Sequence, residues 1–450
     1  MKMFTTNKFF IGSALLLALS LGQKLNAQEV ITIQQAVENT LTNNLQIKQA
    51  QFNAAVTDEN LKQSKNALLP TLSGSVSQSM QWGRSQQLSG LFQNTQNYNL
   101  SPNLSANLAL FGGGEKINQI KRNKILLAVD QSNVEKVKND LILQVVTSYL
   151  QVLAAEDQVK ATRQQLEVSN ATLKREQALL DVGNKTLADI SQAKSTAATS
   201  ELNLTDAQNT LTIAYLTLGQ LMEFQPPMNF KVQPPLVNDL ANIDKKYSAY
   251  DIYNQALGIF PDIKVASLST KAAEKAIDVA KGNYFPKVSI GGGLGSAYYY
   301  QFNNVFGSNS PFFNQLADNF GKFVSMSISI PILNGFSTRS SVRIAKINLQ
   351  QRKTEEQLAK NNLNKVISQA VADLIAAQSR FESTQNAFQA QKDAFYVIEQ
   401  RYNVGLVNSL DFSTAQTNRN KAEIDFIQAK YDLLFRAKVI DYYLGRQITF

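Results

Sequence analysis

The sequence predicts an α+β membrane protein with an internal two-fold duplication. Residues 324–333, VSMSISIPIL, alternate apolar and mostly small polar side chains, which is typical of a strand with one apolar face. Residues 115–182 and 337–404 contain neither proline nor glycine, so each is expected to form one helix about 100 Å long. The same order of helices and strands occurs twice along the chain, which indicates a duplicated sequence.

Composition excludes several classes of function. The 450 residues carry 44 basic and 35 acidic side chains, and the net charge of +9 is too evenly spread for a nucleic-acid interface. Histidine and cysteine are absent, so the commonest general base and the commonest metal ligand are missing. We therefore predict no enzyme activity, no cofactor, no metal site and no nucleic-acid partner.

Residues 1–27 have the pattern of a secretory signal peptide. Lys2 and Lys8 accompany a short apolar stretch at 9–21, and cleavage is expected near Ala27. An uncleaved anchor is the less favoured alternative, because this stretch is too short to span a bilayer stably. No later segment resembles a transmembrane helix. The chain is therefore expected to be exported, with strands making any membrane-spanning part.

Two copies of one plan divide the rest of the chain. Leu41–Val76 is similar to Leu257–Gly292, and the dipeptide Val-Gly at 182–183 recurs at 404–405. Between the copies, the proline-rich stretch FQPPMNFKVQPPLV predicts a linker. The predicted organisation is a first repeat at 28–223, a linker at 224–247 and a second repeat at 248–446.

Each repeat is expected to begin with one helix and continue with two strands. The helices are expected at about 31–67 and 248–282, because each ends at the approach to a proline. In the first repeat, the apolar side chains of one strand share a face; they are Leu104, Ala106, Leu108 and Leu110. The four strands are expected at about 71–83, 100–111, 287–300 and 323–333.

The strands suit a membrane β-barrel. Trp82 and the run Tyr298, Tyr299, Tyr300 lie where an aromatic belt would contact outer-membrane lipid. A half-buried strand of a soluble sandwich would show the same alternation, so this alternative stays open. The signal peptide and the polar loops at 83–99 and 301–320 favour the membrane interpretation.

Four strands cannot close a barrel alone. Open sheet edges are not tolerated in lipid, so the chain is expected to form an oligomer. A dimer would supply eight strands, the smallest barrel known, and a trimer would supply twelve. Small side chains on the inner face would then line a lumen.

The long helices carry the apolar spacing of a coiled coil. In the second repeat this spacing runs from Leu363 to Tyr402, and in the first repeat it runs from Leu141 to Leu180. Helical hairpins are therefore expected at about 114–220 and 337–445, where they would form the wall of a tube or rod. Polar residues interrupt the first run, namely Ser148, Thr162, Ser169 and Glu176.

The turns that close the two hairpins are similar. Gly183 and Gly405 suit the left-handed residue that ends a helix. Thr186 and Asn408 suit the N-cap of the next helix, with an aspartate three residues later in each case. Capping explains these aspartates, Asp189 and Asp411, without a further role. Alternatively, a symmetric oligomer would repeat them around its axis as an acidic ring.

Taken together, these features resemble the TolC-like outer membrane efflux protein (outer membrane factor) family. The most specific marks are the duplication, the junctions LFGGGE (110–115) and ILNGFS (332–337), and the two Val-Gly turns. The resemblance implies a homotrimer with one shared twelve-stranded outer-membrane barrel and a long α-helical tunnel in the periplasm. It also implies partners: a periplasmic adaptor, or membrane fusion protein, and an inner-membrane RND or ABC transporter.

The resemblance also implies roles for residues at the hairpin tips. In relatives, acidic residues after the second turn narrow the tunnel mouth; Asp411 matches the first of these, and Thr414 stands at the second. Asp189 matches a position that holds the gate closed. Relatives carry a basic residue where this chain has Val407. Lys185 stands at the equivalent position of the first turn. Contacts with the adaptor are expected at Val182, Gly183, Val404 and Gly405.

The predicted function is therefore a passive exit duct of a tripartite efflux or type I secretion system. Small molecules or proteins would pass through it, and the inner-membrane transporter would supply the energy. The alternative is a trimeric coiled-coil and barrel surface anchor, or adhesin. Such an anchor should have four consecutive strands at its C-terminus, whereas the strands here are expected in two separate pairs.

Overall fold

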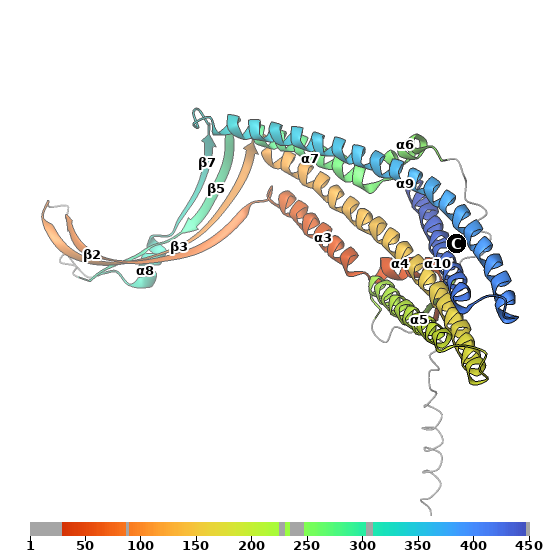
Figure 1. The fold of residues 1–450 in the computed structure, drawn as a ribbon. Helices are drawn as coiled ribbons and strands as arrows, with labels where there is room; N and C mark the ends of the chain where they lie inside the picture. Colours follow the sequence, from red (N-terminus) through yellow and green to blue (C-terminus); the bar gives the residue numbers. More distant parts are fainter. Residues whose placement is uncertain (1–28, 87–89, 225–229, 235–246, 303–308, 447–450) are drawn as a thin grey trace, which may run out of the picture. The chain divides into compact units, whose positions relative to one another are not determined.

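The structure is a computed structural model of the chain (Figure 1). The predicted signal peptide at 1–27 lies outside the residues that it describes. No helix in the described part of the chain is both long and apolar enough to cross a membrane. The described residues are 29–86, 90–224, 230–234, 247–302 and 309–446.

The chain forms two compact units, and each contains parts of both predicted repeats. We call one the sheet unit, which comprises Gln46–Val137 and Asn254–Lys365. The other, the tip unit, comprises the described residues of the segments Met1–Leu45, Lys138–Tyr253 and Val366–Phe450. The repeats predicted from the sequence are therefore not the compact units of the fold.

The sheet unit contains one antiparallel sheet with the strand order β2-β3-β5-β7 (Figure 1). β6 follows β5 along the same edge of β3 and pairs with residues 97–100 of β3. The strands are β2 (Thr71–Gln86), β3 (Phe92–Gly112), β5 (Lys287–Gly295), β6 (Tyr298–Gln301) and β7 (Gly321–Ser329).

The register gives this sheet an apolar face and a polar face, as the alternation predicts. On the apolar face, one row across the four strands consists of Leu72, Ala106, Gly292 and Val324. On the polar face, Ser73 lies opposite Ser105, and their hydroxyl oxygens are 3.1 Å apart. The strand alternation inferred from the sequence is therefore confirmed.

The ends of the strands differ from the prediction. β2 and β3 extend into the expected loop at 83–99, where Gln86 pairs with Phe92. β7 stops at Ser329 because Pro331 has no N–H to donate to a neighbouring strand. The strand expected at 287–300 is divided between β5 and β6. A bulge at Leu110 takes this residue out of the alternation, and Phe111 pairs with Val288 instead.

The helix expected at the start of each repeat is broken in two. α2 (Ile33–Asn43) and α3 (Leu45–Asn66) are separated by Asn44, whose backbone is extended. α6 (Ala249–Ile259) and α7 (Pro261–Gly282) are separated by Phe260. The second break follows from Pro261, because a proline disfavours the helical conformation of the residue before it.

The four longest helices agree with the prediction. α4 (Glu115–Asp181) and α9 (Ser337–Asn403) have 67 residues each. α5 (Leu187–Leu221) and α10 (Ser409–Tyr443) have 35 residues each. A short helix, α8 (Phe312–Asp318), precedes β7.

A small parallel sheet contributes to the core of the tip unit. It pairs β1 (Glu29–Ile31) with β4 (Phe230–Val232), which lies in the segment predicted to be a linker. Phe230 and Val232 are buried in the same apolar cluster as Tyr149. The Tyr149 hydroxyl lies 2.9 Å from the Ile31 carbonyl oxygen, and burial raises the pKa of Tyr149 to about 12. This part of the predicted linker is therefore packed into the core.

Candidate functional site

The two turns at the ends of the hairpins have the same backbone geometry. Gly183 and Gly405 adopt φ values of 80° and 79°, which only glycine reaches without strain. In the first turn, the Asn184 N–H donates to the Leu179 carbonyl at 2.8 Å, as in a Schellman motif. In the second turn, Leu406 donates to Arg401 at 2.9 Å in the same way. The sequence prediction of two similar helix ends is confirmed.

Both predicted N-caps are also present. The Thr186 hydroxyl accepts from the Asp189 N–H, and the Asp189 carboxylate accepts from the Thr186 N–H at 3.0 Å. At the start of α10, the Asn408 side chain accepts from the Asp411 N–H at 2.8 Å and donates to the Asp411 carboxylate at 3.0 Å. Each predicted aspartate therefore has a local structural partner.

Asp189 also has a partner in the other hairpin. A hydrogen bond from Ser409, followed by bonds from the Thr186 backbone and hydroxyl, lowers the pKa of Asp189 to about 2. Ser409 is the first residue of α10, so this bond connects the start of one returning helix with the start of the other. The carboxylate is consequently ionised at every physiological pH.

A buried carboxylate that the sequence did not identify as functional lies close by. Glu176 of α4 has no exposed side-chain surface. Its carboxylate accepts a hydrogen bond from the Tyr402 hydroxyl, and the Ser409 hydroxyl oxygen lies 3.4 Å from it. Lys185 of the first turn forms an ion pair with Glu176 at 3.2 Å. We call these four residues the Glu176 cluster; it joins α4, the first turn, α9 and α10.

Aromatic and cationic groups surround the ring of Tyr402. Phe412 of α10 stacks on the ring, with centroids 4.3 Å apart. The Lys185 ammonium lies 4.9 Å from the ring centroid, and the Arg175 guanidinium lies 5.1 Å from it. Burial, with a further contribution from the bond to Glu176, raises the pKa of Tyr402 to about 12. Tyr402 is therefore a neutral hydrogen-bond donor at pH 7.

Arg175 makes a second connection between the hairpins. Its guanidinium donates to the carbonyl oxygens of Tyr402 and Asn403, both at 3.3 Å, and to the Asn403 side chain. These carbonyls belong to the last turn of α9, where a cation satisfies unpaired acceptors and the helix dipole. The end of α9 is thus bound to α4.

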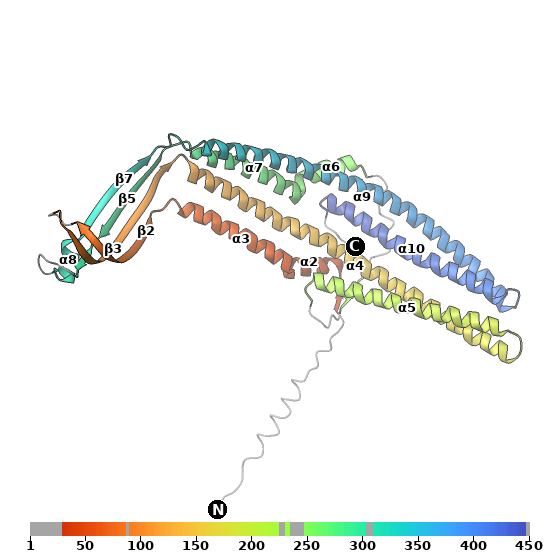
Figure 2. The ribbon, with the colours of Figure 1, turned by 60° about the vertical axis from the view of Figure 1, so that its left-hand side comes forward.

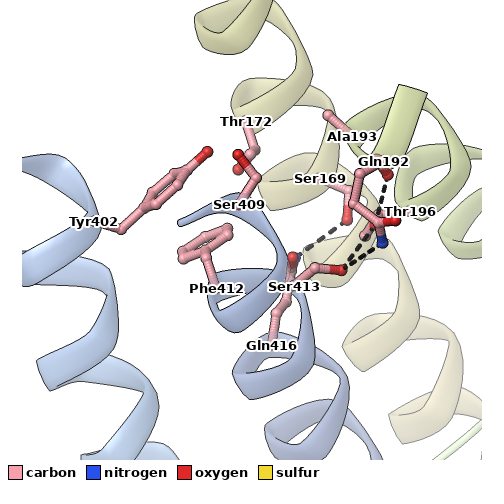
Figure 3. Close-up of a pocket in the computed structure, with 10 residues that line it drawn as sticks. All are labelled: Ser169, Thr172, Gln192, Ala193, Thr196, Tyr402, Ser409, Phe412, Ser413 and Gln416. Carbon is pink, nitrogen blue, oxygen red and sulfur yellow. Dashed lines mark hydrogen bonds between the residues drawn. The ribbon is translucent and has the colours of Figure 1, made fainter. Parts of the chain in front are cut away.

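Farther from the turns, the contacts of α10 with α5 and α4 are polar. Thr196 and Ser413 place their hydroxyl oxygens 3.0 Å apart, and Gln416 donates to the Ser169 hydroxyl at 3.2 Å (Figure 3). The side chains enclose a cavity of about 10 Å³, which is room for about one water molecule. Hydroxyl pairs of this kind exchange readily with water, so this contact opposes separation of the hairpins less than an apolar seam would.

Val407 and Lys185 occupy different environments. Val407 stands where relatives are expected to have a basic residue, and it packs against the aromatic cluster of Phe395, Tyr402 and Phe412. The cation near these aromatic rings comes instead from the first turn, as Lys185. The network around Tyr402 therefore contains a cation, Lys185, although the second turn has no basic residue at the expected position.

The other predicted tip residues are exposed. Val182, Gly183, Val404 and Gly405 form the outer surfaces of the turns, and Thr414 is exposed on α10. Asp411 is exposed as well, whereas Asp189 is partly buried. The acidic ring that Asp189 and Asp411 would form around the axis of an oligomer therefore stays a prediction.

Only part of the predicted aromatic belt shares one face of the sheet. Tyr300 lies opposite Tyr98, which lies opposite Met80, so Tyr298 and Tyr300 project from the apolar face with Trp82. Tyr299 lies opposite Asn99 and projects from the polar face. The belt stays a prediction for Trp82, Tyr298 and Tyr300, and the register separates Tyr299 from it.

Comparison with known proteins gives one family. The model of the family described as "Outer membrane efflux protein" matches residues 36–222 and 252–446. The outer membrane efflux protein BepC of Brucella suis is 22% identical over 413 residues, which cover 90% of this chain and 85% of BepC. The toluene efflux pump outer membrane protein TtgC of Pseudomonas putida is 24% identical over 401 residues, covering 87% and 78%.

Solved structures of similar fold include the CmeC outer membrane channel of Campylobacter jejuni. It superposes with a TM-score of 0.76 at 18% identity, covering 92% of this chain and 85% of that one. A structure of VceC from Vibrio cholerae gives a TM-score of 0.72 at 17% identity, covering 92% and 94%. At these identities the likeness concerns the fold.

Proposed function

Because this chain belongs to the outer membrane efflux protein family, we propose that three copies form one exit duct gated at the hairpin tips. The chain acts in efflux at the outer membrane of a Gram-negative cell. In the proposed assembly the sheets close one twelve-stranded barrel, and the helical hairpins extend it into the periplasm. A periplasmic adaptor and an inner-membrane RND or ABC transporter deliver the cargo.

The two edges of the sheet support the proposal of an oligomer, and the number of three copies is taken from the family. Within the described residues, β2 pairs only with β3, and β7 pairs only with β5. Unpaired backbone groups are too costly in lipid, so β2 and β7 need strands from neighbouring copies. The apolar face then contacts lipid, and the polar face, with Ser73 and Ser105, lines the lumen.

The exposed surfaces of the turns support the proposal of an adaptor. Both turns present large apolar side chains to solvent; these are Val182, Leu187, Val404, Leu406 and Leu410. A monomeric soluble surface rarely concentrates such side chains without a partner. We assign this surface to contact with the helical end of an adaptor.

The Glu176 cluster supports the proposal of a gate. Any outward movement of the second hairpin at 401–411 must separate Tyr402 and Ser409 from Glu176. Removing one partner from a buried charged group is costly, whereas the hydroxyl contacts farther along exchange easily with water. The cluster therefore holds the tips together at rest, and the adaptor supplies the free energy that opens them.

A disulfide between the hairpins tests this gate. Thr196→Cys combined with Ser413→Cys places two thiols where hydroxyl oxygens are 3.0 Å apart. The natural chain contains no cysteine, so no native thiol can compete with the introduced pair. We expect the oxidised variant to open rarely in single-channel recordings, and we expect a reductant to restore the openings.

The matched control is Ser73→Cys combined with Ser105→Cys, a pair at 3.1 Å on the polar face of the sheet. Its oxidation should leave the opening frequency unchanged, because it lies outside the hairpins. If the oxidised Thr196→Cys/Ser413→Cys variant opened as often as the reduced one, opening would not require these helices to separate.

The adhesin alternative finds no support in the order of the elements. Helices α4, α5, α6 and α7 lie between β3 and β5 along the chain. A surface anchor with four consecutive C-terminal strands does not have this order.

A further inference from the structure

The apolar face of the sheet has an open groove that its small residues create. Ala106 and Gly292 lie side by side in one row of the register. The next row toward the loop end of the sheet carries Leu104 and Leu294, which lie opposite each other. Leu72 and Val324 border the groove on either side, and its volume is about 590 Å³. This size is within the range of small-molecule sites, and the walls are almost wholly apolar.

A lysine stands at one end of this groove. Lys322 lies opposite Leu294, so its side chain belongs to the apolar face. Its side chain is exposed, and within the described residues no side chain forms a hydrogen bond or an ion pair with its ammonium group. A cation on a lipid-contacting face is destabilising unless it reaches the interface or meets an anion.

The position of Lys322 along β7 indicates which leaflet it meets. β7 begins at Gly321, so Lys322 is the first side chain of the apolar face at the loop end of the strand. Phe320 lies two residues before it, and farther toward the loop end the same face carries an aromatic group that includes Tyr98, Tyr298 and Tyr300. Aromatic rings mark the interface of a membrane barrel. The long helices α4 and α9 leave the sheet at its other end (Figures 1 and 2), so in the proposed assembly Lys322 lies on the side away from the periplasm.

We infer that this groove binds one lipopolysaccharide molecule of the outer leaflet, with an acyl chain along Ala106 and Gly292 and a lipid A phosphate on Lys322. The charge of Lys322 complements a phosphate, and an ammonium binds phosphate oxygens with short charge-assisted hydrogen bonds. The inference rests on the proposed function, because the apolar face meets lipid only in a membrane barrel.

Native mass spectrometry of the full chain, extracted from outer membranes in detergent, tests this inference. We expect the assembled protein to retain lipopolysaccharide, and we expect Lys322→Gln to lower the retained fraction about tenfold through loss of one charge-assisted contact. Ala106→Leu, which fills the groove, should lower it similarly. The control is Lys353→Gln, which removes an exposed lysine from α9.

Reconstitution distinguishes the two sources of a lipid phosphate. The probes are nanodiscs that contain either lipopolysaccharide or phosphatidylglycerol. Retention of phosphatidylglycerol that depends equally on Lys322 would overturn the assignment to lipopolysaccharide. Equal retention by wild type and Lys322→Gln would overturn the site itself. The same spectra report the number of chains, so a failed assembly, which refutes the proposed function, is distinguishable from a lipid site that is absent.

Discussion

Glu176 shows how a single residue can connect two hairpins. It interrupts the apolar spacing of α4, and the sequence alone presents it as a break in that pattern. The structure places it out of contact with solvent, between Tyr402 and Lys185. A charged residue at a core position of a coiled coil is costly unless it is paired. Its position in the heptad pattern was therefore the available signal that a polar partner lies opposite.

The first prediction concerns the hydroxyl of Tyr402. Tyr402→Phe keeps the stacking on Phe412 but removes the donor to Glu176, which should cost about 1.5–3 kcal/mol, as for other hydrogen bonds to charged groups. We expect a lower melting temperature and more frequent channel openings in planar bilayers. Tyr396→Phe, at an exposed position of the same helix, is the control. Identical opening frequencies in the two variants would remove Tyr402 from the gate.

A second prediction uses the pKa of Asp189. The folded value of about 2 lies below the ordinary value of 3.8, so the folded state favours the carboxylate. This stabilisation is complete above about pH 4 and is lost as the pH falls from 3.8 to about 2. The melting temperature of Asp189→Asn should therefore lie below that of wild type at pH 7, and the difference should shrink toward pH 2. A difference that stays constant down to pH 2 would contradict the bonds assigned to Asp189.

At the scale of the elements, short sequence signals explain where most helices end. Gly183 and Gly405 close α4 and α9, and Thr186 and Asn408 open α5 and α10. Each of these signals acts within about one helical turn, so it is visible in the sequence. The break before Pro261 is equally local, although the prediction of one continuous helix overlooked it.

The third prediction tests one of these helix ends. Gly405→Ala forces a residue with a Cβ atom into a left-handed conformation, which should cost about 1–2 kcal/mol. The control is Gly258→Ala, since Gly258 lies within α6 and an added Cβ there meets no atom within 4 Å. Gly258 is the last residue but one of this helix and does not have the left-handed φ of Gly405, so this change should stabilise by at most about 0.5–1 kcal/mol. Thermal unfolding of both variants measures the contrast, and equal melting temperatures would argue against a strained turn.

Other boundaries depend on residues far away along the chain. Asn44 separates α2 from α3, and its side chain donates to the Leu221 carbonyl at 3.0 Å. β1 forms only because β4 pairs with it across most of the first repeat. The bulge at Leu110 depends on how β5 packs beside β3. No local sequence pattern predicts these features.

At the scale of the whole molecule, the number of chains in the assembly is the central quantity. The fourth prediction is that the protein extracted from outer membranes has the mass of three chains. Four barrel strands per chain and two unpaired sheet edges require neighbouring copies, and the helical hairpins need a closed ring to form a duct. Light scattering in detergent measures this mass. A stable monomer would mean that the edges of β2 and β7 are covered in another way.

The sequence by itself determined the long helices, the two glycine turns, the N-caps, the strand alternation and the resemblance to efflux channels. These features follow from local conformational preferences and from the spacing of apolar residues, which are properties of neighbouring positions. Only the tertiary structure decided that Glu176 meets Tyr402 and Lys185, that Tyr299 lies apart from Tyr298, and that Lys322 borders a groove. These contacts depend on the register of strands and helices that are distant in the chain, and a single sequence does not display that register.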